Sequence, residues 1–391
     1  MSRWKSWKFG PNARVLPVVR LTPLPDADAC TKMGIRLTLR EPDTVARRHP
    51  SGSPPEGLQH IINDPSAFLV KKRRDWDTLK YSRLYAGEVY PIGASYDVVA
   101  EDCWLHTPSG TVITRDKRVL AFSSYSLDSF YQGHSEVPWE EAPWVTESSF
   151  TLATVWGTNF AHWLMDALPK ADALVSHDKR RIVLNRRAPE FQKASLQLLG
   201  HCETDVPEGS LIRFKELHFV SSIRSGVPDP RPLLRIRDRF RAGAGTKPDT
   251  HPRRLYISRQ ETRRKILNHA DVFPVLQEFG FEEVFCEEID FAEQIRLFSS
   301  TEAIFGAHGA GTLNVLFAPR GSALIEAYNP QVWDHGAHRV ASLVGVRHFH
   351  LFSGNASKDF DVRIDPNLLA RTLALALKAE PPDPRLIETV F

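Results

Sequence analysis

Three polar stretches in the second half of the chain each follow a short apolar run. The first carries Arg259, with Arg264 and Lys265 just beyond it. The second is the glycine-rich run 306–311, and the third carries Glu326. Each apolar run has the length and composition of a buried strand, and the polar residues stand where such a strand would end. The carboxyl ends of parallel strands are where α/β sheets bind ligands.

These residue types suit a phosphorylated ligand. Glycines at a strand-to-helix turn let backbone N–H groups approach phosphate, and the helix N-terminus adds positive potential. Arginine offers a planar fork to phosphate oxygens, and a carboxylate at the next strand end can hold ribose hydroxyls. The combination predicts a nucleotide diphosphate site made by a donor-binding set: Arg259, Arg264, Lys265, His308, Gly309, Ala310, Gly311, Asn314 and Glu326.

Each of these signals has a plainer interpretation when taken alone. The glycine run reads G-x-x-G-x-G, which is neither the dinucleotide nor the Walker fingerprint and also fits a tight turn. His308 alone fits a turn or core histidine, and residues 263–265 fit a solvated helix start. Their occurrence at successive strand ends favours the site.

A second candidate lies in the first half of the chain. His162 and Asp166 are four residues apart in a helix predicted to begin at Asn159, so they share one helical face. Either side chain can accept a proton from a nucleophilic hydroxyl. The same spacing also fits a structural hydrogen bond. As a catalytic pair we favour Asp166 as the base, since burial can tune a helix-borne carboxylate.

The segments that carry these residues are predicted to alternate between strand and helix. A hairpin is predicted at 110–114 and 118–122, and a basic linker at 231–253. The pattern predicts two α/β halves with parallel sheets facing a cleft. The expected parts are an irregular arm (1–80) and two Rossmann-like domains (81–240 and 250–391). The predicted elements are strands at 150–156, 181–184, 217–220, 254–258, 281–285, 303–305, 323–326 and 346–352, and helices at 159–177, 189–199, 271–279, 290–299, 311–317 and 366–378.

Composition narrows the class of protein. The 391 residues suit two domains, and 42% hydrophobic with 25% charged residues is typical of globular chains. A net charge of +3 argues against a dedicated nucleic-acid binder. No apolar run is long enough to span a bilayer, and the run 15–19 is too short for a signal peptide, so we expect a cytosolic chain. Tryptophans interleaved with basic residues in 1–20 predict peripheral membrane contact, with a flexible soluble arm as the alternative.

We expect no metal ion and no cofactor. Asp-x-Asp triplets occur at 26–28, 75–77 and 359–361, of which the last is the best placed, yet all fall outside the strand ends described above. His335, His338, His348 and His350 resemble ligand spacing, but no cysteine partner is evident. The four cysteines are far apart and are expected to be free thiols.

An ordered set of segments resembles glycosyltransferase family 61. Residues 159–169 resemble its N-x-x-H-W-x-x-D-x-L-P segment, and the likeness covers about residues 85–350. Thr312 departs from the leucine or methionine that often follows the last glycine. The other similar segments, in the same order, are 256–259, 264–268, 291–294, 306–314, 317–319 and 324–326.

The resemblance implies a GT-B fold, an inverting transfer and a nucleotide-sugar donor. The family includes plant xylosyltransferases and animal O-GlcNAc transferases, while its bacterial members are associated with capsular and other surface polysaccharides. With no signal anchor, the chain looks bacterial. We expect a metal-independent transferase acting on a saccharide or lipid-linked saccharide. The alternatives are a non-catalytic nucleotide-sugar-binding assembly protein and a hydrolase, although no serine or cysteine nucleophile motif supports the latter.

Overall fold

The computed structural model describes residues 18–20, 24–48, 51, 88–125, 139–174, 180–202, 204–222, 225–246, 252–329, 334–353 and 359–378. Two compact units make up the chain. The first is Met1–Asp43 with Gly93–Ser225, and the second is Thr44–Ile92 with Gly226–Phe391. Most of residues 1–20 and the triplet 75–77 lie outside the described residues.

The first unit contains a mixed sheet, not the all-parallel sheet expected from the sequence. Among the described residues its strand order is β1-β7-β6-β5-β12-β9-β10-β11, with β2 also beside β5 and β8 beside β12. The long pair β5 and β12 is antiparallel, whereas β9, β10 and β11 run parallel. The strands are β1 (Val18–Val19), β2 (Ile35–Glu41), β5 (Ser95–His106), β6 (Thr111–Ile113), β7 (Val119–Leu120), β8 (Trp144–Val145), β9 (Ser149–Thr151), β10 (Arg181–Val183), β11 (Thr204–Asp205) and β12 (Leu211–Val220).

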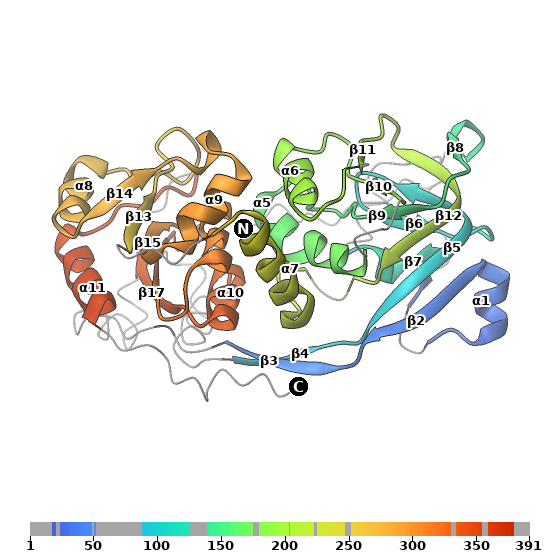
Figure 1. The fold of residues 1–391 in the computed structure, drawn as a ribbon, viewed down its shortest axis with the longest axis horizontal. Helices are drawn as coiled ribbons and strands as arrows, with labels where there is room; N and C mark the ends of the chain where they lie inside the picture. Colours follow the sequence, from blue (N-terminus) through green and yellow to red (C-terminus); the bar gives the residue numbers. More distant parts are fainter. Residues whose placement is uncertain are drawn as a thin grey trace, which may run out of the picture. The chain divides into compact units, whose positions relative to one another are not determined.

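Short helices flank this sheet. They include α1 (Ala27–Met33) and α6 (Glu190–Leu198) (Figure 1). The predicted hairpin is confirmed as the antiparallel pair β6–β7. The helix predicted at 159–177 is instead irregular: α5 (Phe160–His162) leads into a π-helical turn (Trp163–Ala167) and a 3-10 helix (Leu168–Ala173). Pro169 explains the change, because its ring and missing N–H disrupt the hydrogen bonding of an α-helix interior.

The second unit contains a five-stranded sheet in which every pair is parallel. Its order among the described residues is β14-β13-β15-β16-β17. The first strand of this sheet along the chain, β13, lies inside the sheet. The chain adds β14 on one side of β13 and then β15, β16 and β17 on the other side, so the boundary between β13 and β15 is the switch point of a doubly wound sheet. The strands are β13 (Arg253–Ile257), β14 (Phe281–Val284), β15 (Thr301–Ala307), β16 (Ala323–Tyr328) and β17 (Arg347–Phe352).

Helices cover both faces of this sheet, with α8 (His269–Glu278) and α11 (Pro366–Lys378) on one side and α9 (Phe291–Ser299) and α10 (Gly336–Val344) on the other (Figure 1). The predicted capping at Asp290 is confirmed, since its carboxylate accepts the N–H of Glu293 at 2.7 Å. The predicted helix at 311–317 is a 3-10 helix (Ala310–Phe317).

Further segments of the second unit differ from the sequence-based expectation, and one of them is α10, where no helix was predicted. The basic segment predicted as a linker is mostly α7 (Pro230–Gly243), which belongs to the second unit and buries Leu233, Ile236 and Phe240. These three residues follow helical spacing, so they form one apolar stripe. The antiparallel pair β3 (Thr44–Arg48) and β4 (Glu88–Ile92) also belongs to the second unit, although β3 was expected in the arm (1–80) and β4 in the first domain (81–240).

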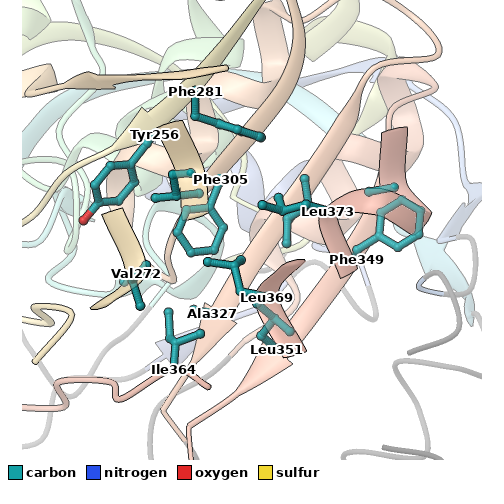
Figure 2. Packing of buried hydrophobic residues seen from close by; sticks show 14 of the residues in the cluster. Tyr256, Val272, Phe281, Phe305, Ala327, Phe349, Leu351, Ile364, Leu369 and Leu373 are labelled. Carbon is teal, nitrogen blue, oxygen red and sulfur yellow. The ribbon is translucent and has the colours of Figure 1, made fainter. Parts of the chain in front are cut away.

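The core of the second unit follows strand alternation. Ile325 and Ala327 of β16 and Phe349 and Leu351 of β17 point to one face, where Leu369 and other residues of α8 and α11 pack (Figure 2). Their neighbours along each strand point to the opposite face. That opposite face is where the polar residues of β16 and β17 lie.

Two further observations concern the described residues. Cys30, Cys103, Cys202 and Cys286 are all free thiols. None of the described helices has the length and apolar character required to cross a bilayer.

Gly110 is predicted to be essential for the first unit. It has φ +70°, and an added Cβ would lie 2.0 Å from the Ala153 carbonyl oxygen. Gly200 has φ +86° with no heavy atom within 4 Å of such a Cβ. Gly200→Ala should therefore cost only the left-handed backbone term, roughly 1–2 kcal/mol. Gly110→Ala should cost about 1–3 kcal/mol more because of the clash. Urea unfolding of the two variants measures the difference, and equal losses would contradict the packing argument.

Candidate functional site

Two arginines gather at the glycine loop (residues 306–311) that follows β15. A Cβ on Gly309 would lie 2.7 Å from Nη1 of Arg259, so the guanidinium rests directly on the loop. Arg259 Nε also donates to the carbonyl of Arg263 at 3.0 Å, and Arg264 Nη1 donates to the carbonyl of His308 at 3.0 Å. The structure thus brings Arg259, Arg264, His308 and Gly309 together at this loop, and their role as a donor-binding set stays a prediction.

Burial and repulsion from neighbouring arginines both disfavour the charged forms of these two guanidiniums. Burial lowers the pKa of Arg259 and of Arg264, and for Arg264 the second cause is repulsion from Arg259. Arg264 also has φ +67°, a left-handed conformation that is uncommon outside glycine. An anion bound between two such cations would relieve their repulsion. Backbone strain of this kind clusters at ligand-binding sites.

The glycine loop packs closely on the first strand of the sheet. A Cβ on Gly311 would lie 3.1 Å from Ile257 Cγ2. Asn314 fixes the loop from behind, since its Nδ2 donates to the Gly311 carbonyl at 3.2 Å and to Gln294 Oε1 at 2.9 Å. Asn314 Oδ1 is buried and has no hydrogen-bond partner among the described residues. Buried acceptors normally find a partner in the protein, in water or in a ligand.

Lys265 lies apart from this packing. Its side chain is exposed, and its backbone N–H donates to Asp361 Oδ1 at 2.8 Å. Asp361, part of the best-placed Asp-x-Asp triplet, therefore holds the backbone beside the arginines. Among the described residues, no group of three or more His, Cys, Asp or Glu side chains is arranged to hold a metal ion.

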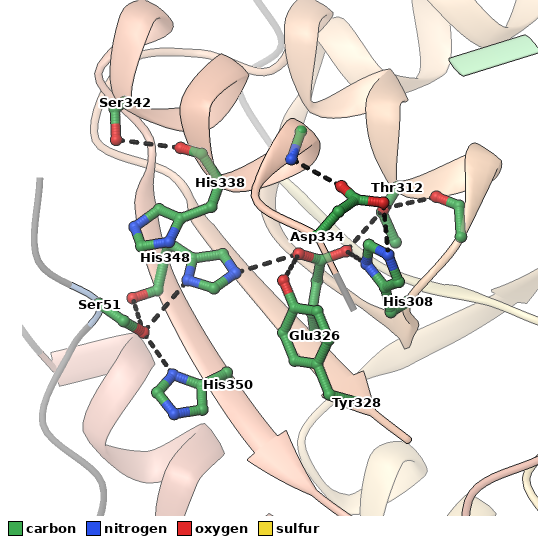
Figure 3. Close-up of polar contacts among 12 residues, drawn as sticks. Ser51, His308, Thr312, Glu326, Tyr328, Asp334, His338, Ser342, His348 and His350 are labelled. Atoms are coloured by element: carbon green, nitrogen blue, oxygen red, sulfur yellow. Dashed lines mark hydrogen bonds and ion pairs between the residues drawn. The ribbon is translucent and has the colours of Figure 1, made fainter. Parts of the chain in front are cut away.

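Glu326 is the centre of the polar network on the opposite face of β16 (Figure 3). Its side chain is fully buried. Thr312 Oγ1 donates to Oε1 at 2.7 Å, and Tyr328 OH donates to Oε2 at 2.6 Å. His308 Nδ1 lies 3.1 Å from Oε1, and His348 Nε2 lies 3.1 Å from Oε2. Burial alone would raise the pKa of Glu326, but hydrogen bonds from His308 and His348, together with the charge of His308, hold it well below its usual range.

These four contacts change the expected role of Glu326. The sequence suggested that its carboxylate holds the ribose of a nucleotide. Each oxygen already has two partners within the protein, and the side chain has no exposed surface. The geometry therefore favours Glu326 as the residue that orients His308 at the start of the glycine loop.

His308 is an imidazolium at neutral pH. Burial favours the neutral ring, but the carboxylates of Asp334 and Glu326 outweigh it and raise the pKa of His308 to about 9. Asp334 Oδ2 lies 3.3 Å from Nε2, yet its side chain is 71% exposed. Solvent screens such a pair, so we assign the effect mainly to buried Glu326. The ring also stacks on Tyr328 at 4.7 Å between centroids.

The histidines that resembled metal ligands form an internal network instead. Ser51 Oγ lies 2.7 Å from His350 Nδ1 and 3.1 Å from His348 Nδ1 (Figure 3). The His338 ring stacks on His348 at 3.9 Å, and Arg48 Nη1 lies 3.1 Å from His338 Nδ1. Burial lowers the pKa of His338, His348 and His350 and keeps these rings neutral. Sequence reasoning missed Arg48 and Ser51, which come from a segment almost 300 residues away in the chain.

The first unit holds the second predicted pair. His162 Nδ1 lies 2.8 Å from Asp166 Oδ2, and Ser225 Oγ donates to the same oxygen at 2.8 Å. The Asp166 side chain is 2% exposed, whereas the His162 side chain is 31% exposed. The imidazole of His162 is therefore the group of this pair that reaches solvent, whereas the Asp166 carboxylate is buried. This geometry runs against the preference for Asp166 as the group that meets a substrate.

Local structure fixes this pair. Asn159 Oδ1 accepts the N–H groups of Ala161 and His162, which starts the helix at the predicted residue. The π-helical turn then carries Asp166, and Trp163 Nε1 anchors it by donating to Ser195 Oγ at 3.0 Å. Single π-helical turns occur frequently at functional sites.

Lys170 and Ser225 are functional candidates that sequence reasoning did not find. Lys170 is buried, and its Nζ donates to Ser222 Oγ at 2.5 Å. Burial lowers the pKa of Lys170 to about 8, and attraction from Asp166 partly opposes that. The signal for Lys170 was its spacing of four residues from Asp166. No local signal pointed to Ser225, because it reaches the pair from a distant part of the chain.

Comparison with known proteins places both clusters in one family segment. Residues 160–325 match the Glycosyltransferase 61 family model. The resemblance to glycosyltransferase family 61 is confirmed. The matched segment of this family includes His162, Asp166, Arg259 and the glycine loop, and it ends one residue before Glu326.

Three relatives share part of this segment. An EGF domain-specific O-linked N-acetylglucosamine transferase of Drosophila melanogaster is 30% identical over 105 residues, which are 26% of this chain and 20% of the relative. An alpha-1,3-arabinosyltransferase of Oryza sativa subsp. japonica is 36% identical over 85 residues, 21% of this chain and 15% of the relative. The EGF domain-specific O-linked N-acetylglucosamine transferase of Bos taurus is 33% identical over 78 residues, which are 19% of this chain and 15% of the relative. The alignments thus span a fifth or less of each relative.

Replacing Glu326 should change how stability depends on pH. The folded-state pKa of His308, about 9, lies above the ordinary 6.5. Its stabilising contribution is therefore fully present below pH 6.5 and is lost as pH rises through about 9. Glu326→Gln removes the buried carboxylate, so the wild type should exceed the variant in Tm most near pH 6 and by progressively less toward pH 9.5.

Thermal unfolding of both proteins between pH 6 and 9.5 measures this trend. Glu302→Gln is the control, because Glu302 lies on β15 of the same sheet but pairs with Arg254 at the surface. The Tm loss in the control should not vary over this range. A loss for Glu326→Gln that is equally constant would contradict the assigned pairing with His308.

Proposed function

We propose that this chain is a metal-independent, inverting glycosyltransferase of GT-B architecture. It transfers a sugar from a nucleotide-sugar donor to a hydroxyl group of a saccharide acceptor. One observation carries the proposal: Arg259, Arg264 and protonated His308 meet at a glycine loop, at the carboxyl edge of a parallel sheet. The match of residues 160–325 to family 61 supports it, as do the doubly wound order of the second sheet and the division into two units.

The positive charge at the glycine loop suits the binding of the nucleotide-sugar donor. When the glycosidic bond to the nucleotide breaks, negative charge grows on the departing diphosphate. Preorganised cations and backbone N–H groups that face this charge are usually the largest catalytic contribution. Arg259 and Arg264 supply fixed guanidiniums, and His308, whose ring pairs with Glu326 and Asp334, holds the start of the glycine loop. Asn314 and the close packing of Gly311 hold the loop in place.

The acceptor side requires one base, and we assign it to His162. Nδ1 of His162 faces Asp166, so Nε2 is the nitrogen available to a substrate. Asp166 fixes the ring and stabilises the imidazolium that forms, as the buried aspartate does in a Ser-His-Asp triad. The acceptor oxygen attacks the anomeric carbon as its proton passes to Nε2, and the diphosphate leaves from the opposite side. A single displacement of this kind inverts the anomeric centre.

The proposal covers more than one donor sugar. The relatives' names include N-acetylglucosamine and arabinose transfer, so both hexose and pentose donors belong in a first screen. The bacterial origin, the role in surface polysaccharide, the cytosolic location and the membrane contact of residues 1–20 stay predictions from the sequence. A non-catalytic nucleotide-sugar-binding protein is the alternative, and the intact His162–Asp166 pair argues against it.

Arg259→Ala should weaken nucleotide binding without unfolding the chain. A hydrogen bond to a charged group is worth roughly 1.5–3 kcal/mol, or about 10-fold to 150-fold in affinity. Calorimetric titration with UDP, GDP and CDP identifies the preferred nucleotide and then compares the variant. Arg320→Ala, which removes an exposed arginine of the same unit, is the charge-matched control. Equal nucleotide affinity in Arg259→Ala and the control would refute the donor site.

His162→Ala should remove transfer while sparing nucleotide binding. General-base catalysis contributes typically ~10²–10⁴-fold, so kcat should fall by about that factor. Asp166→Asn keeps the shape but weakens the orientation of the ring, and its kcat should fall less than that of His162→Ala. Nucleotide release with and without acceptor measures both. If Asp166→Asn is the more damaging change, the carboxylate is the base.

Activity should survive EDTA. The described part of the chain has no metal-ligand cluster near the arginines, and Asp361 already binds the Lys265 N–H. Transfer is measured after chelation, with and without added Mn²⁺ or Mg²⁺. Loss on chelation with recovery on metal addition would overturn the metal-independent mechanism, and Asp359 and Asp361 would then be the first residues to replace.

A further inference from the structure

Trp156 is a large apolar side chain left in solvent beside the proposed base. It is 47% exposed, an exposure that only Trp144 shares among the described tryptophans. A single exposed apolar side chain needs no explanation by itself. Trp156 differs because its ring lies 6.0 Å from the His162 ring, at an interplanar angle of 33°.

The turn that carries Trp156 is fixed by buried side chains. Asn185 bonds both backbone groups of Thr154, with its Oδ1 accepting the N–H at 3.2 Å and its Nδ2 donating to the carbonyl at 2.9 Å. Gln192 Nε2 donates to the Gly157 carbonyl at 2.6 Å. A Cβ on Gly157 would lie 2.1 Å from Asn185 Oδ1, so the turn passes directly against that side chain. The backbone of the turn is thus fixed on both sides of Trp156, while about half of the surface of that side chain is exposed.

The second exposed tryptophan provides a contrast. Trp144 is also 47% exposed and belongs to the same unit. The Arg213 guanidinium lies over its ring at 4.8 Å, so an internal cation–π contact already uses that indole. The ring neighbour of Trp156 is the imidazole to which we assign proton transfer.

The surroundings of Trp156 match one class of ligand. An indole presents a flat apolar face, and a pyranose ring has a face made of C–H groups with hydroxyls at its rim. Such a ring lying on Trp156 brings rim hydroxyls toward His162. Thr158 and Asn159, which follow two and three residues after Trp156 in the chain, are both exposed polar residues. A flexible peptide hydroxyl has no comparable flat apolar face to bury.

We infer that Trp156 is the platform for the acceptor sugar: the C–H face of a pyranose stacks on the indole and presents a ring hydroxyl to His162 Nε2. This inference rests on the proposed function, because it assigns the acceptor side of that reaction. It makes Trp156 a specificity-determining residue that selects a saccharide over a serine or threonine side chain.

Saturation-transfer NMR on the full chain tests the platform without requiring turnover. The probes are methyl glycosides of glucopyranose, galactopyranose, mannopyranose and xylopyranose. In the wild type and in Trp144→Ala, the C–H protons of one sugar face should receive saturation. In Trp156→Ala affinity should fall roughly 10-fold or more, as expected for losing the apolar surface of an indole. Trp156→Phe should recover part of it. An unchanged Tm in Trp156→Ala checks that the exposed residue is not needed for folding.

The outcomes separate this inference from the proposed function. Equal saturation in Trp156→Ala and the wild type, or no pyranoside binding by the wild type, overturns the platform even if nucleotide binding and release proceed. Pyranoside binding that depends on Trp156 supports the platform even if UDP, GDP and CDP all fail to bind, a result that would refute the donor assignment instead. Once an acceptor is known, Trp156→Ala should raise its KM far more than it lowers kcat.

Discussion

The buried carboxylate of Glu326 sets the arrangement of the second unit. A charge without exposed surface is costly unless it is neutralised and hydrogen-bonded, and breaking such a site leaves the charge uncompensated. Glu326 meets this requirement with donors from separate parts of the fold: Thr312 and His308 after β15, Tyr328 on its own strand and His348 on β17. The glycine loop and the last two strands must therefore keep one relative position for the carboxylate to remain satisfied.

Each of the two units contains a histidine paired with a buried carboxylate. In each, a buried carboxylate binds Nδ1 of an imidazole and fixes its orientation, Glu326 for His308 and Asp166 for His162. The consequences differ with exposure. His308 is buried, and the carboxylates of Glu326 and Asp334 occupy both of its ring nitrogens and raise its pKa, which suits a structural role at the start of the glycine loop. His162 keeps part of its ring in solvent and has one carboxylate neighbour, which suits proton exchange with a substrate.

The support of these sites extends beyond the segment matched to family 61. Ser51 lies far before residue 160 and bonds the imidazoles of His348 and His350, which lie after residue 325. Arg48 does the same for His338. Arg48 and Ser51 therefore help to hold the buried histidines, of which His348 bonds Glu326. A match confined to the central segment does not reveal this dependence, because the supporting residues come from both ends of the chain.

The five strands of the parallel sheet in the second unit, and the approximate location of its glycine loop, could be predicted from the sequence, whereas α7, α10 and the β3–β4 pair could not. Apolar residues alternate with Glu326 and Tyr328 on β16, and with His348 and His350 on β17, so local alternation already assigns the polar residues to one face. Local rules also found the Asn159 and Asp290 caps and the His162–Asp166 spacing. These features depend on residues within a few positions of each other.

The contacts of those residues depend on segments that are distant in the sequence. Ser225, from a distant segment, donates to Asp166, and in that pair the His162 imidazole and not the carboxylate reaches solvent. Both oxygens of Glu326 accept hydrogen bonds from donors within the protein. The first sheet is also mixed, since the antiparallel pairing of β5 with β12 joins strands about 100 residues apart. The physical reason is that burial and hydrogen-bond saturation depend on which distant segments pack together. Spacing along the chain fixes the direction of a side chain, but it does not fix its partners.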